Sequence, residues 1–239
     1  MWQPLGGIYQ VSFTVNPQAV VSALFGTTLA FIAIDAVLNV AEFVFGARSL
    51  FGLIPFLDLN RERNLPTWFA SLQLALAAVL LAHASAAAHA RGDRHTWAWK
   101  TLTAGFCFLS LDEFTALHER LNPALEPFVG RSGPWGFPWV AAAVPLVVLL
   151  ALAFGGWLMA LPSRTRRQVM LAGALYVGGA VGVESIGGAI YRSMSPGVLY
   201  AMITTIEEGL ELVGITVFIA ALLRLQQEQP ARSSPVDHR

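Results

Sequence analysis

Four residues that can carry charge or bind a metal stand near the end of a long apolar run. Asp112, Glu113, His118 and Glu119 fall where a bilayer-spanning helix would normally carry Leu, Val or Ala. Burying a carboxylate in hydrocarbon costs several kcal/mol even on lenient insertion scales. A chain that keeps such residues usually uses them, so this segment predicts a functional site inside a membrane protein.

Three other apolar runs also contain acidic residues. The candidate site residues of all four runs are Asp35, Glu42, Asp112, Glu113, His118, Glu119, Glu184, Glu207, Glu208 and Glu211. Counted along their runs, the acids at 35, 112, 184 and 207 lie at a similar depth, about eight to eleven residues from the same predicted side of the bilayer. This agreement predicts one shared acidic core rather than four separate sites.

Helical spacing assigns faces to some of these residues. Asp35 and Glu42 lie on one face of an ideal helix, and so do Asp112 and Glu119. On the same ideal helix His118 points away from that face. We therefore expect the carboxylates to form the walls of the core, with the imidazole as its least secure member.

Composition supports a membrane protein. The chain has 239 residues, of which 55% are hydrophobic and 13% charged, and its mean hydropathy is +0.58. A soluble domain carries about 25% charged residues. The formal net charge is zero, so nothing points to a nucleic-acid partner. The single cysteine, Cys107, excludes an internal disulfide and a thiolate metal centre.

The hydrophobic pattern predicts an all-α, polytopic membrane protein with six transmembrane helices in a single domain, residues 1–225. The expected spans are 18–46, 66–90, 96–121, 138–161, 167–192 and 196–223. Each is long enough to cross roughly 30 Å of hydrocarbon. Residues 226–239 form a polar tail that we expect to be disordered and cytoplasmic, and residues 47–65 are too short to span.

The distribution of Lys and Arg predicts the orientation. Nine basic residues fall in the loops and tail on the side of the two termini, and six fall on the other side. The excess favours both termini in the cytoplasm and a multi-pass protein of the cell inner (plasma) membrane. The acids lie on the first, third, fifth and sixth spans, so we expect these four to surround the core, with the second and fourth outside.

So many carboxylates need a neutralising partner, because they cannot all be ionised together in a low dielectric. Divalent metal binding is the leading hypothesis, with Mn, Fe, Ca, Mg and Zn all open, since oxygen ligands suit hard cations and a histidine extends the range. The protein would then be a cation transporter or a metal-dependent membrane protein, with the lipid bilayer and a divalent cation or small substrate as partners.

Other functions stay open. Carboxylates on four helices resemble the geometry of ferritin-like di-metal oxidoreductases, but the spans lack the Glu-x-x-His pairs of that plan. A proton-coupled carrier or binding subunit would hold the carboxylates protonated. A third interpretation is that the acids are purely structural. A hydrolase using Ser110 or Ser185 lacks a recognisable nucleophile motif. A faint similarity between residues 110–113 and 205–208 hints at the inverted repeats of transporters.

Overall fold

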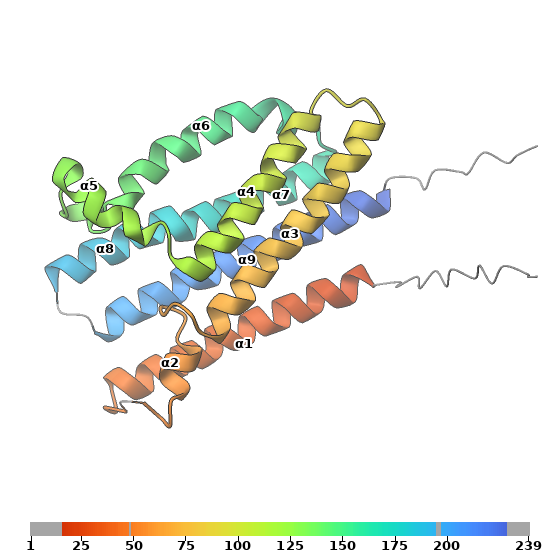
Figure 1. Ribbon diagram of the computed structural model, residues 1–239. Helices are drawn as coiled ribbons and strands as arrows, with labels where there is room; N and C mark the ends of the chain where they lie inside the picture. The colour runs from red at the N-terminus through yellow and green to blue at the C-terminus, as the bar shows by residue number, and fades with distance from the viewer. Residues whose placement is uncertain (1–15, 48, 195–196, 229–239) are drawn as a thin grey trace, which may run out of the picture.

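A computed structural model describes residues 16–47, 49–194 and 197–228, and within these ranges the chain is helical and contains no strand. The predicted disordered tail, residues 226–239, begins too early, because α9 continues as a helix to Glu228; residues 229–239 lie outside the described residues. The helical elements, shown in Figure 1, are α1 (Pro17–Phe43), α2 (Leu53–Leu57), α3 (Leu65–Ala90), α4 (Thr96–Thr115), η1 (Glu119–Leu121), α5 (Asn122–Val129), η2 (Gly133–Trp135), α6 (Trp139–Ala160), α7 (Ser163–Val177), η3 (Gly178–Val183), α8 (Glu184–Ser193) and α9 (Val198–Glu228).

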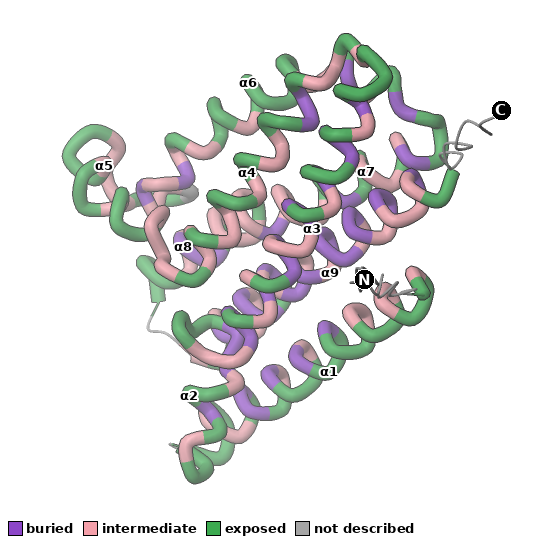
Figure 2. The backbone as a smooth tube through the Cα atoms, turned by 45° about the vertical axis from the view of Figure 1, so that its right-hand side comes forward, coloured by how far each residue is buried: buried purple, intermediate pink, exposed green. Residues whose placement is uncertain are grey.

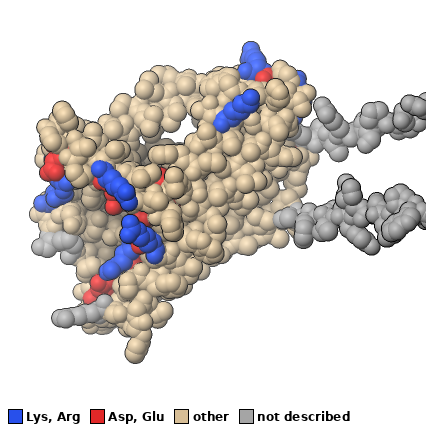
Figure 3. All heavy atoms as spheres, in the orientation of Figure 1, with Lys and Arg blue, Asp and Glu red and all other residues tan. Residues whose placement is uncertain are grey.

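Four helical stretches are long and apolar enough to cross a membrane: Pro17–Phe43, Leu65–Ala90, Trp139–Ala160 and Ser163–Ser193. They match the first, second, fourth and fifth predicted spans. The last of them is one continuous rod made of α7, η3 and α8. The several apolar helices are consistent with a membrane protein. On the face drawn in Figure 3, basic side chains lie near two ends of the molecule, and the stretch between is almost uncharged.

Helix α9 is the centre of the bundle. It packs against α1, α3, α7, η3 and α8, and Figure 2 shows buried positions along most of its length. Its apolar side chains Leu212, Ile219 and Leu222 are almost completely buried. Because nearly every other long helix touches α9, the residues that α9 carries inward must lie near the middle of the molecule.

The positions of the outer helices differ from the sequence-based expectation. Helix α3, predicted to lie outside, packs closely against both α4 and α9, and Gln73 Nε2 donates a 2.9 Å hydrogen bond to Thr216 Oγ1. Helix α1, predicted to face the core, touches mainly α9 and leaves most of its surface exposed. Small residues along α3, such as Ala77 and Ala84, allow this close packing. The expectation that α3 lies outside was based only on its lack of acidic residues.

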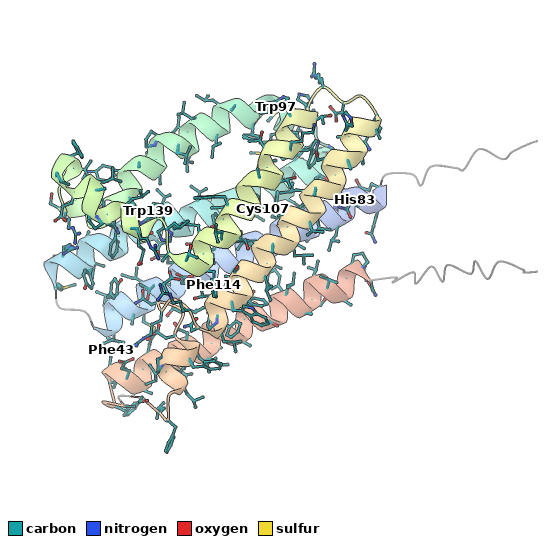
Figure 4. The ribbon with its side chains drawn as sticks, viewed as in Figure 1. Phe43, His83, Trp97, Cys107, Phe114 and Trp139 are labelled. Carbon is teal, nitrogen blue, oxygen red and sulfur yellow. The ribbon has the colours of Figure 1, made fainter. Side chains whose placement is uncertain are left out.

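Helix α6 stands apart from the bundle, as predicted for the fourth span. Most of its side chains are exposed, and only Val140 and Trp157 are buried. Near its C-terminal end, the Phe154 ring lies 5.3 Å from that of Trp97 at the start of α4 (Figure 4). Nearby, Trp157 meets Trp99 edge-on at 5.0 Å between ring centroids. These aromatic pairs join the C-terminal end of α6 to the start of α4.

Glycines allow the rod of α7, η3 and α8 to approach α9. A Cβ on Gly179 would lie 2.7 Å from the carbonyl oxygen of Glu207, and one on Gly214 would lie 2.9 Å from the backbone nitrogen of Tyr176. By contrast, Gly178 and Gly182 face open space. Close packing therefore occurs at some of the glycines of this rod, and at Gly179 the close neighbour is α9.

A hydrogen-bonded network fastens α1 to α9. The buried Asp35 carboxylate accepts hydrogen bonds from Asn39 Nδ2 (2.9 Å), Thr205 Oγ1 (2.6 Å) and the backbone nitrogen of Leu59 (2.9 Å). Three donors satisfy this carboxylate, and one of them holds the loop after α2. Asp35 is thus a structural link among α1, α9 and the 58–64 loop.

Replacing Asp35 tests this link. In Asp35→Ala the Leu59 N–H loses its acceptor and α1 loses its carboxylate bond to Thr205, so we expect unfolding free energy to fall by about 1–3 kcal/mol. Thermal unfolding of the detergent-solubilised protein measures the change. Glu42→Ala, on the same helix but without a hydrogen-bond partner among the described residues, is the control and should unfold like the wild type. Equal midpoints for both variants would contradict the structural role of Asp35.

Candidate functional site

A cavity of about 450 Å³ lies between α9 and the surrounding helices α3, α4, α6 and α7. Its lining contains one imidazole, that of His118, and no Lys or Arg side chain. The carboxylates that line it are Glu62, Asp112, Glu113, Glu119, Glu184, Glu207, Glu208 and Glu211. The cavity therefore collects acidic side chains from five separate segments of the chain, without a Lys or Arg among them.

Helix α9 provides three of these acids within about one turn and a half. Glu207, Glu208 and Glu211 all line the cavity, and Glu207 is only 9% exposed. Glu113 faces the same cavity from α4. Among the described residues, none of these four carboxylates receives a hydrogen bond or an ion pair. They are the polar groups of the cavity whose charge has no partner within that part of the chain.

Asp112 and His118 form a pair that is held by two contacts. The backbone nitrogen of His118 donates to Asp112 Oδ1 at 2.9 Å, and His118 Nδ1 lies 2.9 Å from Asp112 Oδ2. The His118 ring also lies 4.8 Å from the Trp139 ring. With Nδ1 engaged by the carboxylate, Nε2 is the nitrogen left for a ligand.

The expected orientation of His118 is wrong, and the reason is local. The spacing argument assumed one helix through Leu121, whereas α4 ends at Thr115. Ala116 then adopts a left-handed conformation with φ of 50°, which reverses the chain direction. The turn brings His118 back over Asp112 instead of a further half-turn along a helix. A non-glycine residue at positive φ is uncommon, and the sequence gives no warning of it.

Glu184 reaches the cavity through an irregularity in its rod. The six residues Gly178–Val183 form a π-helical turn directly before it. Such turns widen the helix and shift the register of its faces, and they occur frequently at functional sites. The Glu184 carboxylate accepts a 2.9 Å hydrogen bond from Trp139 Nε1, which connects α8 to the start of α6.

Two acids lie at the mouth of the cavity. Glu119 was among the predicted residues and stands exposed in the turn after α4. Glu62 was not predicted, because the run Asn60–Arg63 reads as an ordinary polar loop. It lies across from Glu119, in the loop that Asp35 helps to hold. No spacing rule applies to such a loop residue, so only the fold could place it.

The electrostatics outside the helices follow from these neighbours. Desolvation of its carboxylate, although the residue as a whole is exposed, and the charge of Glu119 raise the pKa of Glu62 to about 7. For His118, burial alone would lower the pKa, but the hydrogen bond and charge of Asp112 outweigh it and raise the pKa above its usual value. The imidazole therefore tends to hold its proton as a partner of the surrounding acids.

Two predicted site residues lie elsewhere. Asp35 belongs to the network that joins α1 to α9 and does not line the cavity. Glu42 lines a second hollow, which we call the end vestibule, a space of about 680 Å³ also bordered by Arg61, Arg131 and Arg192. Helix α1, which carries both residues, packs against α9, and the predicted shared depth of Asp35 with the acids at 112, 184 and 207 does not bring it to the cavity.

The end vestibule adjoins the acidic cavity. Both are lined by Asn60, Glu119, Phe137, Tyr200 and Thr204. The vestibule lies at the end of the bundle opposite to the start of α1 and the end of α9 (Figure 1). The two spaces thus share a wall that leads from the outside of the bundle to the carboxylates.

Within the described residues, no three His, Cys, Asp or Glu side chains already stand close enough together to hold one metal ion. A cation in the cavity would therefore require rotation of the glutamate side chains. Glutamate has three rotatable bonds, and the free space of the cavity leaves room for this movement.

Comparison with known proteins places the chain in a family. Residues 21–225 match the model of a domain of unknown function, DUF8692, and the chain belongs to this family. No curated protein and no solved structure matches the chain. The matched range begins within α1 and ends within α9, so it takes in the cavity and the end vestibule.

The pairing of Asp112 with His118 is testable by titration. We expect the His118 imidazole to titrate above the usual 6.5 and Asp112→Asn to lower its pKa, because the neutral amide no longer favours the charged ring. The stabilisation from this pair is present at low pH and is lost as the pH rises through the His118 pKa. Histidine NMR measures both values, with His118→Gln to assign the resonance.

Asp93→Asn, at the other end of α4, serves as the control and should leave the His118 titration unchanged. An identical His118 pKa in the wild type and Asp112→Asn would show that the pair does not form.

Proposed function

We propose that this member of the DUF8692 family is a six-span inner-membrane protein that binds a divalent cation in its acidic cavity, as a cation transporter or a metal-dependent membrane protein. The observation that carries the proposal is the charge of the lining: eight carboxylates and one imidazole without a single Lys or Arg. Unpaired charge of this density is costly in a low dielectric, and a cation is the direct way to neutralise it.

The donor set fits a divalent metal. Glu113, Glu208 and Glu211 offer carboxylate oxygens without competing hydrogen bonds. His118 offers one nitrogen, whose orientation Asp112 would fix through Nδ1. A carboxylate that positions a ligating histidine in this way is a frequent arrangement around metals. Oxygen ligands with one imidazole suit Mn²⁺ or Fe²⁺ as well as harder cations.

Helices α4 and α9 would be the two further spans. Their 20 and 31 residues correspond to about 30 and 46 Å of helix, enough for the hydrocarbon core. Most of the acids on these helices line the cavity and would not face the lipid, where a carboxylate would be costly in a span. Helix α1 begins and α9 ends at the same end of the bundle (Figure 1), which agrees with two cytoplasmic termini.

The end vestibule supplies a route for the ion. With the termini in the cytoplasm, it would open on the outer side, and the wall that it shares with the cavity leads to Glu119. A polar entrance that ends at a carboxylate-lined space is the arrangement expected for cation access. This route supports ion binding from outside, whether the ion is transported onward or retained.

A metal-dependent membrane oxidoreductase is the second candidate, favoured by one observation. The turn at Ala116 brings His118 into the cavity beside Asp112, whereas the ideal helix kept it outside. A nitrogen ligand makes a redox-active metal more suitable than a set of carboxylates alone does. Spectra of the iron-loaded protein would distinguish this candidate from a carrier of Mg²⁺ or Ca²⁺.

Mn²⁺ binding to the purified protein tests the proposal. The wild type should bind Mn²⁺ saturably, as measured by the loss of the free-ion EPR signal. Glu208→Gln removes an oxygen ligand and Asp112→Asn removes the group that positions His118, so each should weaken binding by about 10–100-fold. Glu42→Gln, outside the cavity, is the matched control and should bind like the wild type.

A wild type that binds no Mn²⁺, Fe²⁺, Mg²⁺, Ca²⁺ or Zn²⁺ would overturn the proposal. So would equal affinities in Glu208→Gln and Glu42→Gln, because binding would then not depend on the cavity.

A further inference from the structure

We propose that the cavity also holds one hydrocarbon chain of a membrane amphiphile, whose oxygen-bearing head group reaches the bound cation at the carboxylates. The position of the head group rests on the function proposed above. The position of the chain rests on a separate feature, the apolar part of the cavity. We call this part the apolar arm and define it by Leu102, Phe106, Leu150, Val169, Gly173 and Phe218.

The lining divides sharply along the cavity. On α4, the residues change from Glu113 at the acidic end to Leu109, Phe106 and Leu102, a distance of about 16 Å along the helix. On α9, the lining changes in the same direction from Glu211 to Phe218. The cavity thus has a charged end and an elongated apolar end, which is the shape and polarity of an amphiphile.

An ion alone does not account for the apolar arm. Water in such a space finds too few polar partners, and a dry empty space costs packing energy. The total volume of about 450 Å³ lies within the range of sites that bind small molecules. A bilayer offers hydrocarbon chains at high concentration, so a chain is the occupant that fits both the lining and the surroundings.

The arm is open toward the expected position of the lipid. Helices α4 and α6 meet through Trp97 and Phe154 at one end, and the His118 and Trp139 rings meet at the other. Between these contacts, both helices line the cavity, and Leu146 and Leu150 of α6 are still 55% and 44% exposed. Figure 3 shows the surface hollowed beneath α6. A chain can therefore enter sideways from the bilayer.

The acidic end selects the head group. Without Lys or Arg in the lining, the carboxylates repel an anionic head group that approaches them directly. A divalent cation between them removes the repulsion and coordinates both. Glu207, buried and without a hydrogen-bond donor among the described residues, is one of the groups that such a cation would contact.

Filling the apolar arm tests the proposal. Gly173 lines the arm, and a Cβ placed there meets no atom within 4 Å, so Gly173→Phe occupies the arm and leaves the carboxylates untouched. Gly105→Phe is the matched control, because Gly105 also has open space around its Cβ and does not line the cavity. The probe is 9,10-dibromostearic acid, added with Mn²⁺ to the full chain in nanodiscs.

The readout is bromine quenching of tryptophan fluorescence relative to unbrominated stearic acid. Trp157 borders the arm and is only 4% exposed, so bromine in the surrounding lipid does not contact it, and Trp157→Phe identifies its contribution. We expect saturable quenching of Trp157 in the wild type and Gly105→Phe, with apparent affinity at least about tenfold weaker in Gly173→Phe. Mn²⁺ affinity should be equal in all three proteins.

Failure of the two proposals can be told apart. Normal Mn²⁺ binding without Trp157 quenching, or with equal quenching in Gly173→Phe and Gly105→Phe, would overturn the chain site and leave the cation site standing. Absence of Mn²⁺ binding would overturn the cation site. Quenching that persists in full without any divalent cation would show that the head group does not bind through one.

Discussion

Unpaired negative charge inside an apolar bundle is the constraint on which this structure depends. Glu113, Glu207, Glu208 and Glu211 face one cavity, and no donor or cation among the described residues accompanies them. Removing one partner of a buried ion pair is strongly destabilising, so charges that are never paired must be neutralised from outside the chain or protonated. The proposed cation site would supply that neutralisation for all four groups together.

The fold serves this site by placing α9 at the centre. Small residues on the neighbouring rod let it approach α9 at Gly179, and α3 packs against α9 through small side chains and the Gln73–Thr216 hydrogen bond. Asp35 shows the contrast with the cavity, because its three donors satisfy it fully. A carboxylate in α1 is therefore fully hydrogen-bonded, whereas the glutamates of α9 have no donor among the described residues.

Apolar runs of bilayer length were sufficient to predict the six long helical segments, since their ends depend on local hydropathy and on Pro and Gly. The acids of α4, α8 and α9 line one cavity, whereas the predicted core that also included the acids of the first span stays a prediction. Three features could not be predicted from the sequence: the left-handed Ala116 that returns His118 to Asp112, the π-helical turn before Glu184, and the loop that brings Glu62 to the cavity. Each depends on irregular backbone, where residue spacing carries no information about direction. The interior position of α3 was not predicted, because the inner helices were chosen by their acidic residues. Helix α3 has none and packs against its neighbours through alanines.

Crystals of the protein soaked in Mn²⁺ and measured at the manganese absorption edge would show whether the cavity binds a cation. We expect an anomalous difference peak inside the cavity, within coordination distance of α9 carboxylate oxygens and of His118 Nε2, with Asp112 still bonded to Nδ1. A cavity without a peak at saturating Mn²⁺, or a peak confined to the end vestibule, would contradict it.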